Sequence, residues 1–186
     1  MKNILKNKKG LSTVVTTLII LVVSVLLATV VTFYAINVTT TRVQEESLLV
    51  NKLHIWCNSS GGWTTGAFVL INTGGKDFVI DKLAVRGQES AWSDVYYWTT
   101  NTVTVSDELT VNTTTLTDGC SLTVQNASRI FSQASNDITL QSGYTMVVYI
   151  ASPDTISQSD IGVTVGMTIH TMNAQYYKEC NVEAAE

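Results

Sequence analysis

The hydrophobic pattern is dominated by one uninterrupted stretch, residues 11–38. No charged residue occurs between Lys9 and Arg42. A helix of about 20 residues crosses the hydrocarbon core of a bilayer, so this stretch is long enough to span with tilt or to project beyond the membrane. Because it is apolar on all sides, it requires lipid or other helices around it. Lysines at positions 2, 6, 8 and 9 precede it, and predict a cytoplasmic N-terminus with the rest of the chain exported.

The pattern changes character beyond Thr41. Charged residues at positions 42, 45, 46 and 52 are interspersed with apolar ones. This amphipathic pattern predicts that the helix continues to Leu53, with one face packed on an outer domain. We therefore divide the working chain into a hydrophobic and amphipathic helix, residues 11–53, and an outer domain, residues 54–186.

The outer domain has the pattern of β-strands. Two apolar runs, residues 68–71 and 78–80, flank the turn signal of residues 72–77. Residues 163–171 alternate between apolar and polar types and are followed by a turn and a further run, and residues 144–151 form another strand-like run. The predicted class is α+β: a long N-terminal hydrophobic helix followed by an all-β immunoglobulin-like sandwich of about eight to eleven strands, a lollipop.

The residues before the apolar stretch resemble a known type of signal. Lys8-Lys9-Gly10-Leu11-Ser12 is similar to the class III signal of archaeal type IV pilins. The resemblance implies that residues 1–10 are a leader, cut between Gly10 and Leu11 by a prepilin-type peptidase, and that the apolar helix stays on the mature protein. Bacterial pilins have glutamate at the fifth mature position, where this chain has Val15. Archaellins usually have a glycine-rich stretch after the cut, which is lacking here.

The resemblance extends into the outer domain. Residues 68–87, with Asn72-Thr73-Gly74-Gly75 between two strands, look like the N-x-G hairpin of archaeal pilins and archaellins, and the final strand pair also fits. The implied function is a structural subunit of a type IV pilus-like surface filament for adhesion. Its partners would be copies of itself, the peptidase, the assembly machinery and, before assembly, the membrane. The alternatives are an archaellin-like motility subunit and a monomeric, membrane-anchored extracellular binding domain.

Small residues line one side of the apolar stretch. At about 100° per residue, five of them fall within about 60° of one another. Such a stripe allows close approach of helix backbones, which a bundle of identical helices needs and a single anchor does not. Chance in a segment rich in threonine and alanine is the alternative. The stripe consists of Thr13, Thr17, Ser24, Ala28 and Ala35.

Charge and motifs argue against several other functions. Residues 54–186 carry five basic and thirteen acidic residues, a net charge of −8. A nucleic-acid-binding protein needs a basic surface, so no nucleic-acid partner is expected. The sequence lacks a nucleophile elbow, a phosphate-binding loop and a His-Glu zinc motif. We expect no enzymatic activity, cofactor or metal, although a fold can assemble a site from distant residues.

Three further sets of residues are candidates for modification or contact. The odd cysteine count leaves at least one thiol unpaired; we favour a Cys57–Cys120 disulfide because both lie beside predicted turns, and three free thiols are the alternative. Four N-glycosylation sequons occur, which is no enrichment over chance; Asn37 lies within the apolar helix, and Asn58, Asn112 and Asn126 are the candidate acceptors. Strand alternation would bury Tyr96 and Trp98 and leave Trp92 and Tyr97 outside, either as ordinary surface residues or as an exposed patch for contact with another subunit or a carbohydrate surface.

Overall fold

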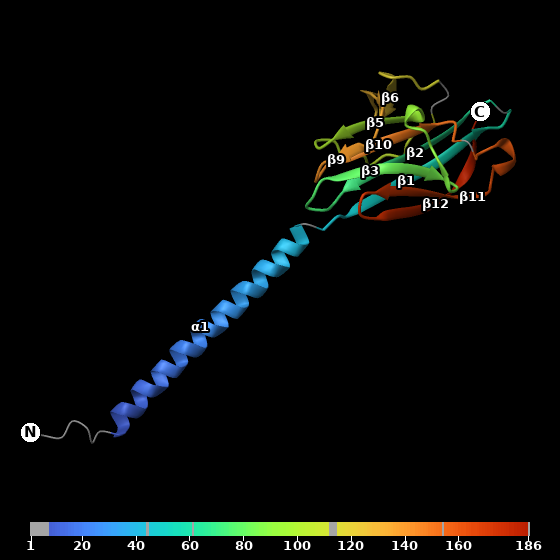
Figure 1. The fold of residues 1–186 in the computed structure, drawn as a ribbon. Helices are drawn as coiled ribbons and strands as arrows, with labels where there is room; N and C mark the ends of the chain where they lie inside the picture. Colours follow the sequence, from blue (N-terminus) through green and yellow to red (C-terminus); the bar gives the residue numbers. More distant parts are fainter. Residues whose placement is uncertain (1–7, 44, 61, 112–114, 154, 186) are drawn as a thin grey trace, which may run out of the picture. The chain divides into compact units, whose positions relative to one another are not determined.

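The computed structural model describes residues 8–43, 45–60, 62–111, 115–153 and 155–185, in two compact units (Figure 1). One unit is the helix α1 (Lys8–Val43), and the other is a β domain that extends to the C-terminal end of the chain. The predicted α+β class is confirmed. Residues 1–7 of the expected leader and the sequon at Asn112 lie outside the described residues.

Helix α1 contains the apolar stretch. Its segment Gly10–Thr41 has 32 residues, includes an 18-residue window with a mean hydropathy of 2.9, has no buried side chain, and is long and apolar enough to cross a membrane. Hydroxyl groups within it donate to carbonyl oxygens one turn earlier, as Thr29 Oγ1 does to Val25 at 2.8 Å. Those intrahelical bonds satisfy the hydroxyl hydrogens, so these residues are compatible with apolar surroundings.

The helix ends at Val43, and the predicted continuation to Leu53 is wrong. Residues 48–53 instead begin strand β1 (Leu48–Asn58). A short apolar run fits either periodicity. Here the neighbouring strands decide, because β1 pairs with β2 along its length and with β12 at its far end, and these ladders satisfy its backbone groups.

The β domain contains twelve strands within the described residues, one more than the upper end of the expected range (Figure 1). Their hydrogen-bonded order is β4-β3-β11-β12-β1-β2-β10-β5-β8, with β9 also paired to β3, and β6 and β7 form a separate pair. The expected hairpin of β11 and β12 is confirmed. The remaining bounds are β2 (Thr64–Asn72), β3 (Phe78–Val85), β4 (Gln88–Glu89), β5 (Val95–Thr100), β6 (Ser121–Val124), β7 (Ala127–Ile130), β8 (Ser132–Gln133), β9 (Ile138–Leu140), β10 (Thr145–Ala151), β11 (Thr164–Thr171) and β12 (Gln175–Ala185).

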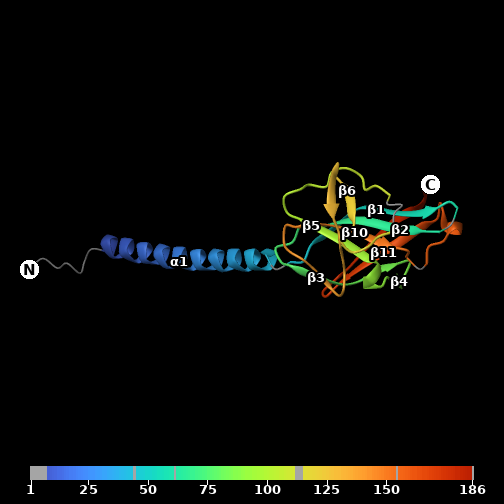
Figure 2. The same cartoon turned by 90° about the horizontal axis from the view of Figure 1, so that it is seen from above.

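The strand order folds into two layers around a first core cluster (Figure 2). One layer contributes side chains of β1, β2, β5 and β10, such as Phe68 and Met146, and the other contributes side chains of β3, β9, β11 and β12, such as Leu83 and Ile169. All four of these side chains are at most 1% exposed. This arrangement is a β-sandwich with alternating inward residues on its strands.

The turn at residues 72–77 does not close a hairpin. Strand β2 pairs with β1 and β10, whereas β3 pairs with β11, β4 and β9. The turn therefore carries the chain from one layer to the other, and the predicted pairing of its two flanking runs is wrong. Asn72 is 1% exposed, and its side-chain amide donates to the carbonyl oxygens of Lys76 and Leu140. These hydrogen bonds fix the turn that connects the two layers.

A third layer lies over the outer face of the β1-β2-β10-β5 layer. It consists of the described parts of residues 101–131, including the β6–β7 pair, which stands above β5 and β10 in Figure 2. Its side chains pack on outward residues of the sandwich such as Val69, Val147 and Tyr149 to form a second core cluster. This layer thus buries a sheet face that a two-layer sandwich would expose to water. The members it contributes are Val105, Leu109, Leu116, Leu122, Val124 and Phe131.

Candidate functional site

Strand β1 contains an irregularity that reverses which of its side chains face inward. Asn51 pairs with Val69 and His54 with Ala67, so β1 has one residue more than β2 between these pairs. Before the bulge, the even-numbered Leu48 faces the first core cluster. After the bulge, the odd-numbered Leu53, Ile55 and Cys57 face that cluster. A bulge of this kind re-aims the strand. It turns the polar Lys52 and His54 away from the sandwich core.

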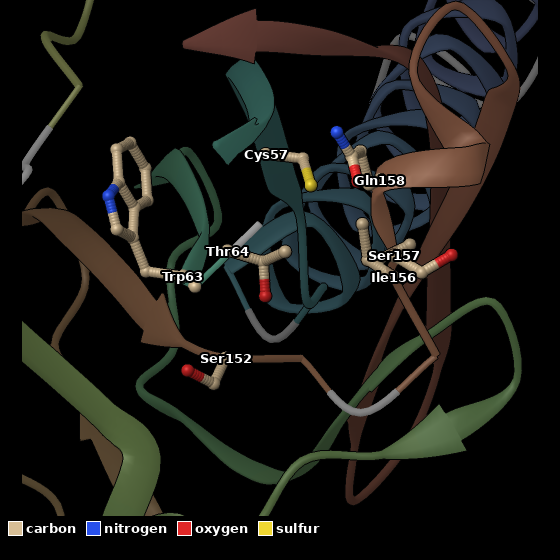
Figure 3. A pocket seen from close by; sticks show the side chains of 8 residues that line it. Cys57, Trp63, Thr64, Ser152, Ile156, Ser157 and Gln158 are labelled. Atoms are coloured by element: carbon tan, nitrogen blue, oxygen red, sulfur yellow. The ribbon is translucent and has the colours of Figure 1, made fainter. Parts of the chain in front are cut away.

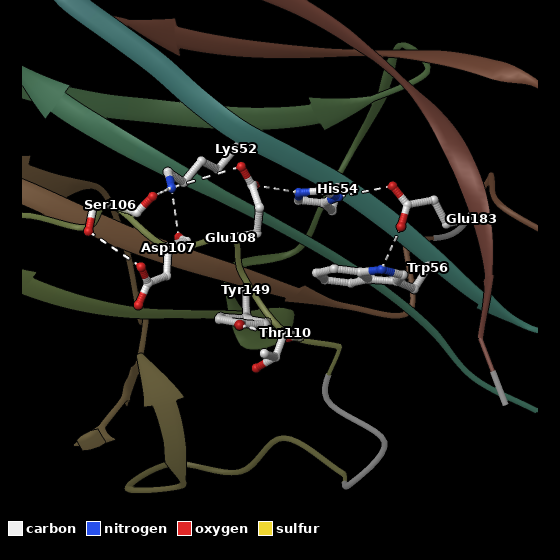
Figure 4. A network of polar contacts seen from close by, with 9 residues as sticks. All are labelled: Lys52, His54, Trp56, Ser106, Asp107, Glu108, Thr110, Tyr149 and Glu183. Atoms are coloured by element: carbon white, nitrogen blue, oxygen red, sulfur yellow. Dashed lines mark hydrogen bonds and ion pairs between the residues drawn. The ribbon is translucent and has the colours of Figure 1, made fainter. Parts of the chain in front are cut away.

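Lys52 occupies the bulge in the left-handed region, with φ of 52°. This conformation costs a residue with a Cβ about 1–2 kcal/mol. Its ammonium group donates to the carbonyl oxygen of Ser106 and, at 2.7 Å, to that of Asp107, and lies 4.0 Å from Glu108 Oε1 (Figure 4). These contacts fasten β1 to the segment of residues 103–111, which we call the strap.

His54 lies between two carboxylates that come from different parts of the fold (Figure 4). Its Nε2 is 3.0 Å from Glu108 Oε2 on the strap, and its Nδ1 is 3.0 Å from Glu183 Oε1 on β12. The ring stacks on Trp56 at a centroid distance of 5.1 Å, and Trp56 Nε1 donates to Glu183 Oε2 at 3.0 Å. The imidazole therefore bridges the strap, β1 and β12.

The strap is also held against the sandwich by two buried side chains and by a hydrogen bond from β10. Val105 and Leu109 are 8% and 6% exposed in the second core cluster. Tyr149 donates its hydroxyl hydrogen to the carbonyl oxygen of Thr110 at 3.0 Å. Burial raises the pKa of Tyr149 to about 12, so the hydroxyl keeps its proton and remains a donor at neutral pH.

A shallow hollow of about 270 Å³ lies where β1 ends (Figure 3). The residues that line it include Cys57, Thr64 and Ser152. Cys57 is 2% exposed, and burial raises the pKa of its thiol, so the thiol remains protonated near neutral pH. A thiol needs a lowered pKa, the opposite shift, to act as a nucleophile.

The described residues also contain no group of three or more His, Cys, Asp or Glu side chains that could hold a metal ion.

All three cysteines are free, so the predicted Cys57–Cys120 disulfide is wrong. Cys57 faces the first core cluster, whereas Cys120 packs against the second. The β1-β2-β10-β5 layer lies between those two clusters, which prevents the sulfurs from meeting. Cys180 lies on β12, half-buried against the first cluster, and burial raises the pKa of its thiol to about 11.

The predicted exposed patch of Trp92 and Tyr97 is also wrong. Both side chains are half-buried and pack against the first core cluster. Tyr96, which is 5% exposed, and Trp98 pack against the second cluster. Strand alternation separates the two faces of β5 as expected. The opposite layer of the sandwich covers one face of β5 and the third layer covers the other, which the prediction did not include.

The other candidate residues lie on surfaces. Gly10 and Leu11 are exposed within α1, and so is every member of the small-residue stripe, Thr13, Thr17, Ser24, Ala28 and Ala35. Thr17 and Ser24 donate their hydroxyl hydrogens to Val14 and Ile20 of the same helix, at 2.9 and 2.6 Å. Their contribution to a helix–helix contact would therefore be small size rather than hydrogen bonds donated across it.

The two sequons in the described part of the β domain differ in setting. Asn126 is exposed at the turn of the β6–β7 pair, with φ of 56°. Asn58 is half-buried at the end of β1, and its side-chain oxygen accepts the N–H of Ser60 at 2.8 Å. The accessible acceptor of the two is Asn126.

Sequence reasoning missed the polar cluster around His54. The predicted helix included Lys52, and His54 was not among the candidate residues. A local signal was available, because Lys52, His54 and Trp56 alternate with Leu53, Ile55 and Cys57 at the period of a strand. Nothing local links these residues to Glu108 and Glu183, which come from distant parts of the chain.

Comparison with known proteins finds no family model that matches this chain and no curated protein that is significantly similar to it.

Proposed function

We propose that this protein is a structural subunit of an archaeal type IV pilus-like surface filament, assembled through α1 after leader cleavage and used for adhesion. The observation that carries the proposal is the segment Gly10–Thr41, which is uncharged and has no buried side chain in the single chain. Apolar surface of this extent requires lipid or other apolar helices around it. A membrane-inserted precursor satisfies the first requirement and a bundle of identical helices the second.

The edges of the β domain are consistent with assembly through the helix. The strands at the ends of the sheet order, β4 and β8, have two residues each, and β9 has three. Short edge strands offer few unpaired backbone groups to another chain. The β domains of neighbouring copies are therefore poorly suited to pair edge to edge. Helix α1 is the large apolar surface that remains for contact between copies.

The charge pattern gives the proposed precursor an orientation. Lysines on the N-terminal side of α1 would keep that end in the cytoplasm, so the acidic β domain would be outside the cell. Cleavage after Gly10 would remove four lysines that oppose movement of the helix out of the membrane. The helix could then pass from lipid into a filament core with little change in the apolarity of its surroundings.

The processing site gives the first test. Protein extracted from the cell surface should begin at Leu11 by N-terminal sequencing. A Gly10→Val variant should remain full length when expressed with the peptidase, because a side chain blocks close approach to the backbone. The matched control Leu11→Ile should be cut normally. A retained Met1 in wild-type protein, or efficient cutting of Gly10→Val, would favour the membrane-anchored ectodomain instead.

The stripe gives the second test. Thr17→Leu with Ala28→Leu keeps the helix apolar, so membrane insertion should be unchanged, but the added bulk should keep neighbouring helices apart and lower filament yield severalfold. Val15→Leu with Val22→Leu adds bulk on the opposite side of the helix, about 150–170° from the centre of the stripe. Electron microscopy and membrane fractionation measure both outcomes. Equal yields from the two double variants would contradict a role for the stripe.

A further inference from the structure

We propose that His54 is a pH-dependent latch: its imidazolium form holds the strap, residues 103–111, against β1 and β12, and loss of its proton releases the contact with the strap. The inference goes beyond the proposed filament role and concerns the β domain alone.

Both ring nitrogens of His54 face carboxylate oxygens, Glu183 Oε1 and Glu108 Oε2, each at 3.0 Å. An ionised carboxylate only accepts hydrogen bonds, and a neutral imidazole has only one N–H to donate. Two donated bonds therefore require the doubly protonated ring. The arrangement in Figure 4, in which both carboxylates contact the ring of His54, is therefore that of the imidazolium form, and we call it the closed strap.

The two carboxylates are not equally anchored. Glu183 also accepts a hydrogen bond from Trp56 Nε1, and its strand β12 pairs with β1 beside His54, at Ile55 and Val182. Glu108 has a side chain that is 70% exposed and lies on the irregular strap. When one N–H is lost, the bond to the fixed Glu183 is retained more readily. Deprotonation therefore frees the strap side of the latch.

The charges that face His54 set the direction of its titration. They are Glu183 on β12, Glu108 on the strap, and Lys52 on β1 itself, whose Nζ is 4.0 Å from Glu108 Oε1; Asp107 on the strap meets Lys52 through its backbone oxygen. Burial lowers the pKa of His54, but the hydrogen bonds and charges of Glu108 and Glu183 outweigh it and raise the pKa above 6.5. The hydrogen bond from His54 lowers the pKa of Glu108, so that carboxylate remains ionised.

The raised pKa of His54 determines the direction in which the stability of the closed strap changes with pH. The folded protein binds the proton of His54 more tightly than the unfolded chain does. The latch therefore stabilises the closed strap fully below about pH 6.5, and the contribution is lost as the pH rises through the folded-state pKa. The contacts from Lys52, the Tyr149–Thr110 bond and the burial of Leu109 do not depend on this proton. The strap should loosen without unfolding of the domain.

Hydrogen exchange on the full chain in detergent micelles tests the latch. After correction for the intrinsic pH dependence of exchange, peptides within residues 103–111 should exchange roughly threefold to tenfold faster at about pH 8.5 than at about pH 5.5. Peptides from β10, beneath the strap, should show no such change. His54→Gln should give fast strap exchange at both pH values.

The only other histidine of the chain supplies a matched control. His170 lies half-buried on β11, in the layer opposite to the strap-bearing one, so His170→Gln should retain the full pH effect. Glu108→Gln changes an exposed side chain, so the variant should fold, and it should abolish the effect by removing the strap's carboxylate. Strap exchange in the wild type that is independent of pH would overturn the proposal. So would a pH effect that survives in His54→Gln or Glu108→Gln, or one that is lost in His170→Gln.

Discussion

A Phe131→Ala variant is expected to lower the free energy of unfolding of the β domain by about 3–5 kcal/mol, the usual cost of removing a buried phenylalanine ring. Phe131 is 0% exposed in the second core cluster. Its ring meets Tyr149 edge-on at a centroid distance of 5.4 Å. Because Phe131 belongs to the third layer and Tyr149 to β10, the substitution removes a contact that joins that layer to the sandwich.

The adjacent residue provides the control. Ile130 is 69% exposed, so Ile130→Ala should change the free energy of unfolding by no more than about 0.5 kcal/mol. Denaturant titration followed by tryptophan fluorescence measures both, since all four tryptophans lie in the β domain. A loss below about 1 kcal/mol in Phe131→Ala, or equal losses in both variants, would contradict the packing described for the third layer.

A Gly74→Ala variant is expected to cost about 2–3 kcal/mol, as overpacking of a rigid site does. A Cβ at position 74 would lie 2.6 Å from the carbonyl oxygen of Glu45 and 2.7 Å from the backbone nitrogen of Ser47. These are backbone atoms at the start of the β domain, and the N–H groups of Thr73 and Gly74 both donate to the carbonyl oxygen of Ser47. The added methyl group should push these segments apart and break those bonds.

Gly166→Ala separates this effect from a general intolerance of glycine replacement. A Cβ at position 166 would also meet a close neighbour, but that neighbour is the side chain of Tyr177, which is 63% exposed and can rotate away. The expected cost is below about 1 kcal/mol. The same denaturant titration reports on both glycines. The account of the turn at Gly74 fails if Gly74→Ala is as stable as Gly166→Ala.

Local patterns were sufficient for several elements of this protein. The uncharged stretch predicted a helix able to cross a membrane, and the segment Gly10–Thr41 confirms it. The alternation at residues 163–171 predicted β11 and its hairpin with β12. The apolar run at 144–151 predicted β10. In each case the periodicity of neighbouring residues carries the information, because a helix or a strand imposes its period within a few residues.

The tertiary structure alone decided the end of the helix, the layer to which each strand belongs and the sides on which the cysteines lie. Residues 48–53 fit either period, and pairing with β2 made them a strand. The bulge before His54 then set which side chains of β1 meet the core and which meet the strap. Glu108 and Glu183 reach His54 from 54 and 129 residues away along the chain. Register and layer order depend on such long-range contacts, since a shift of one residue sends every side chain of a strand to the opposite face.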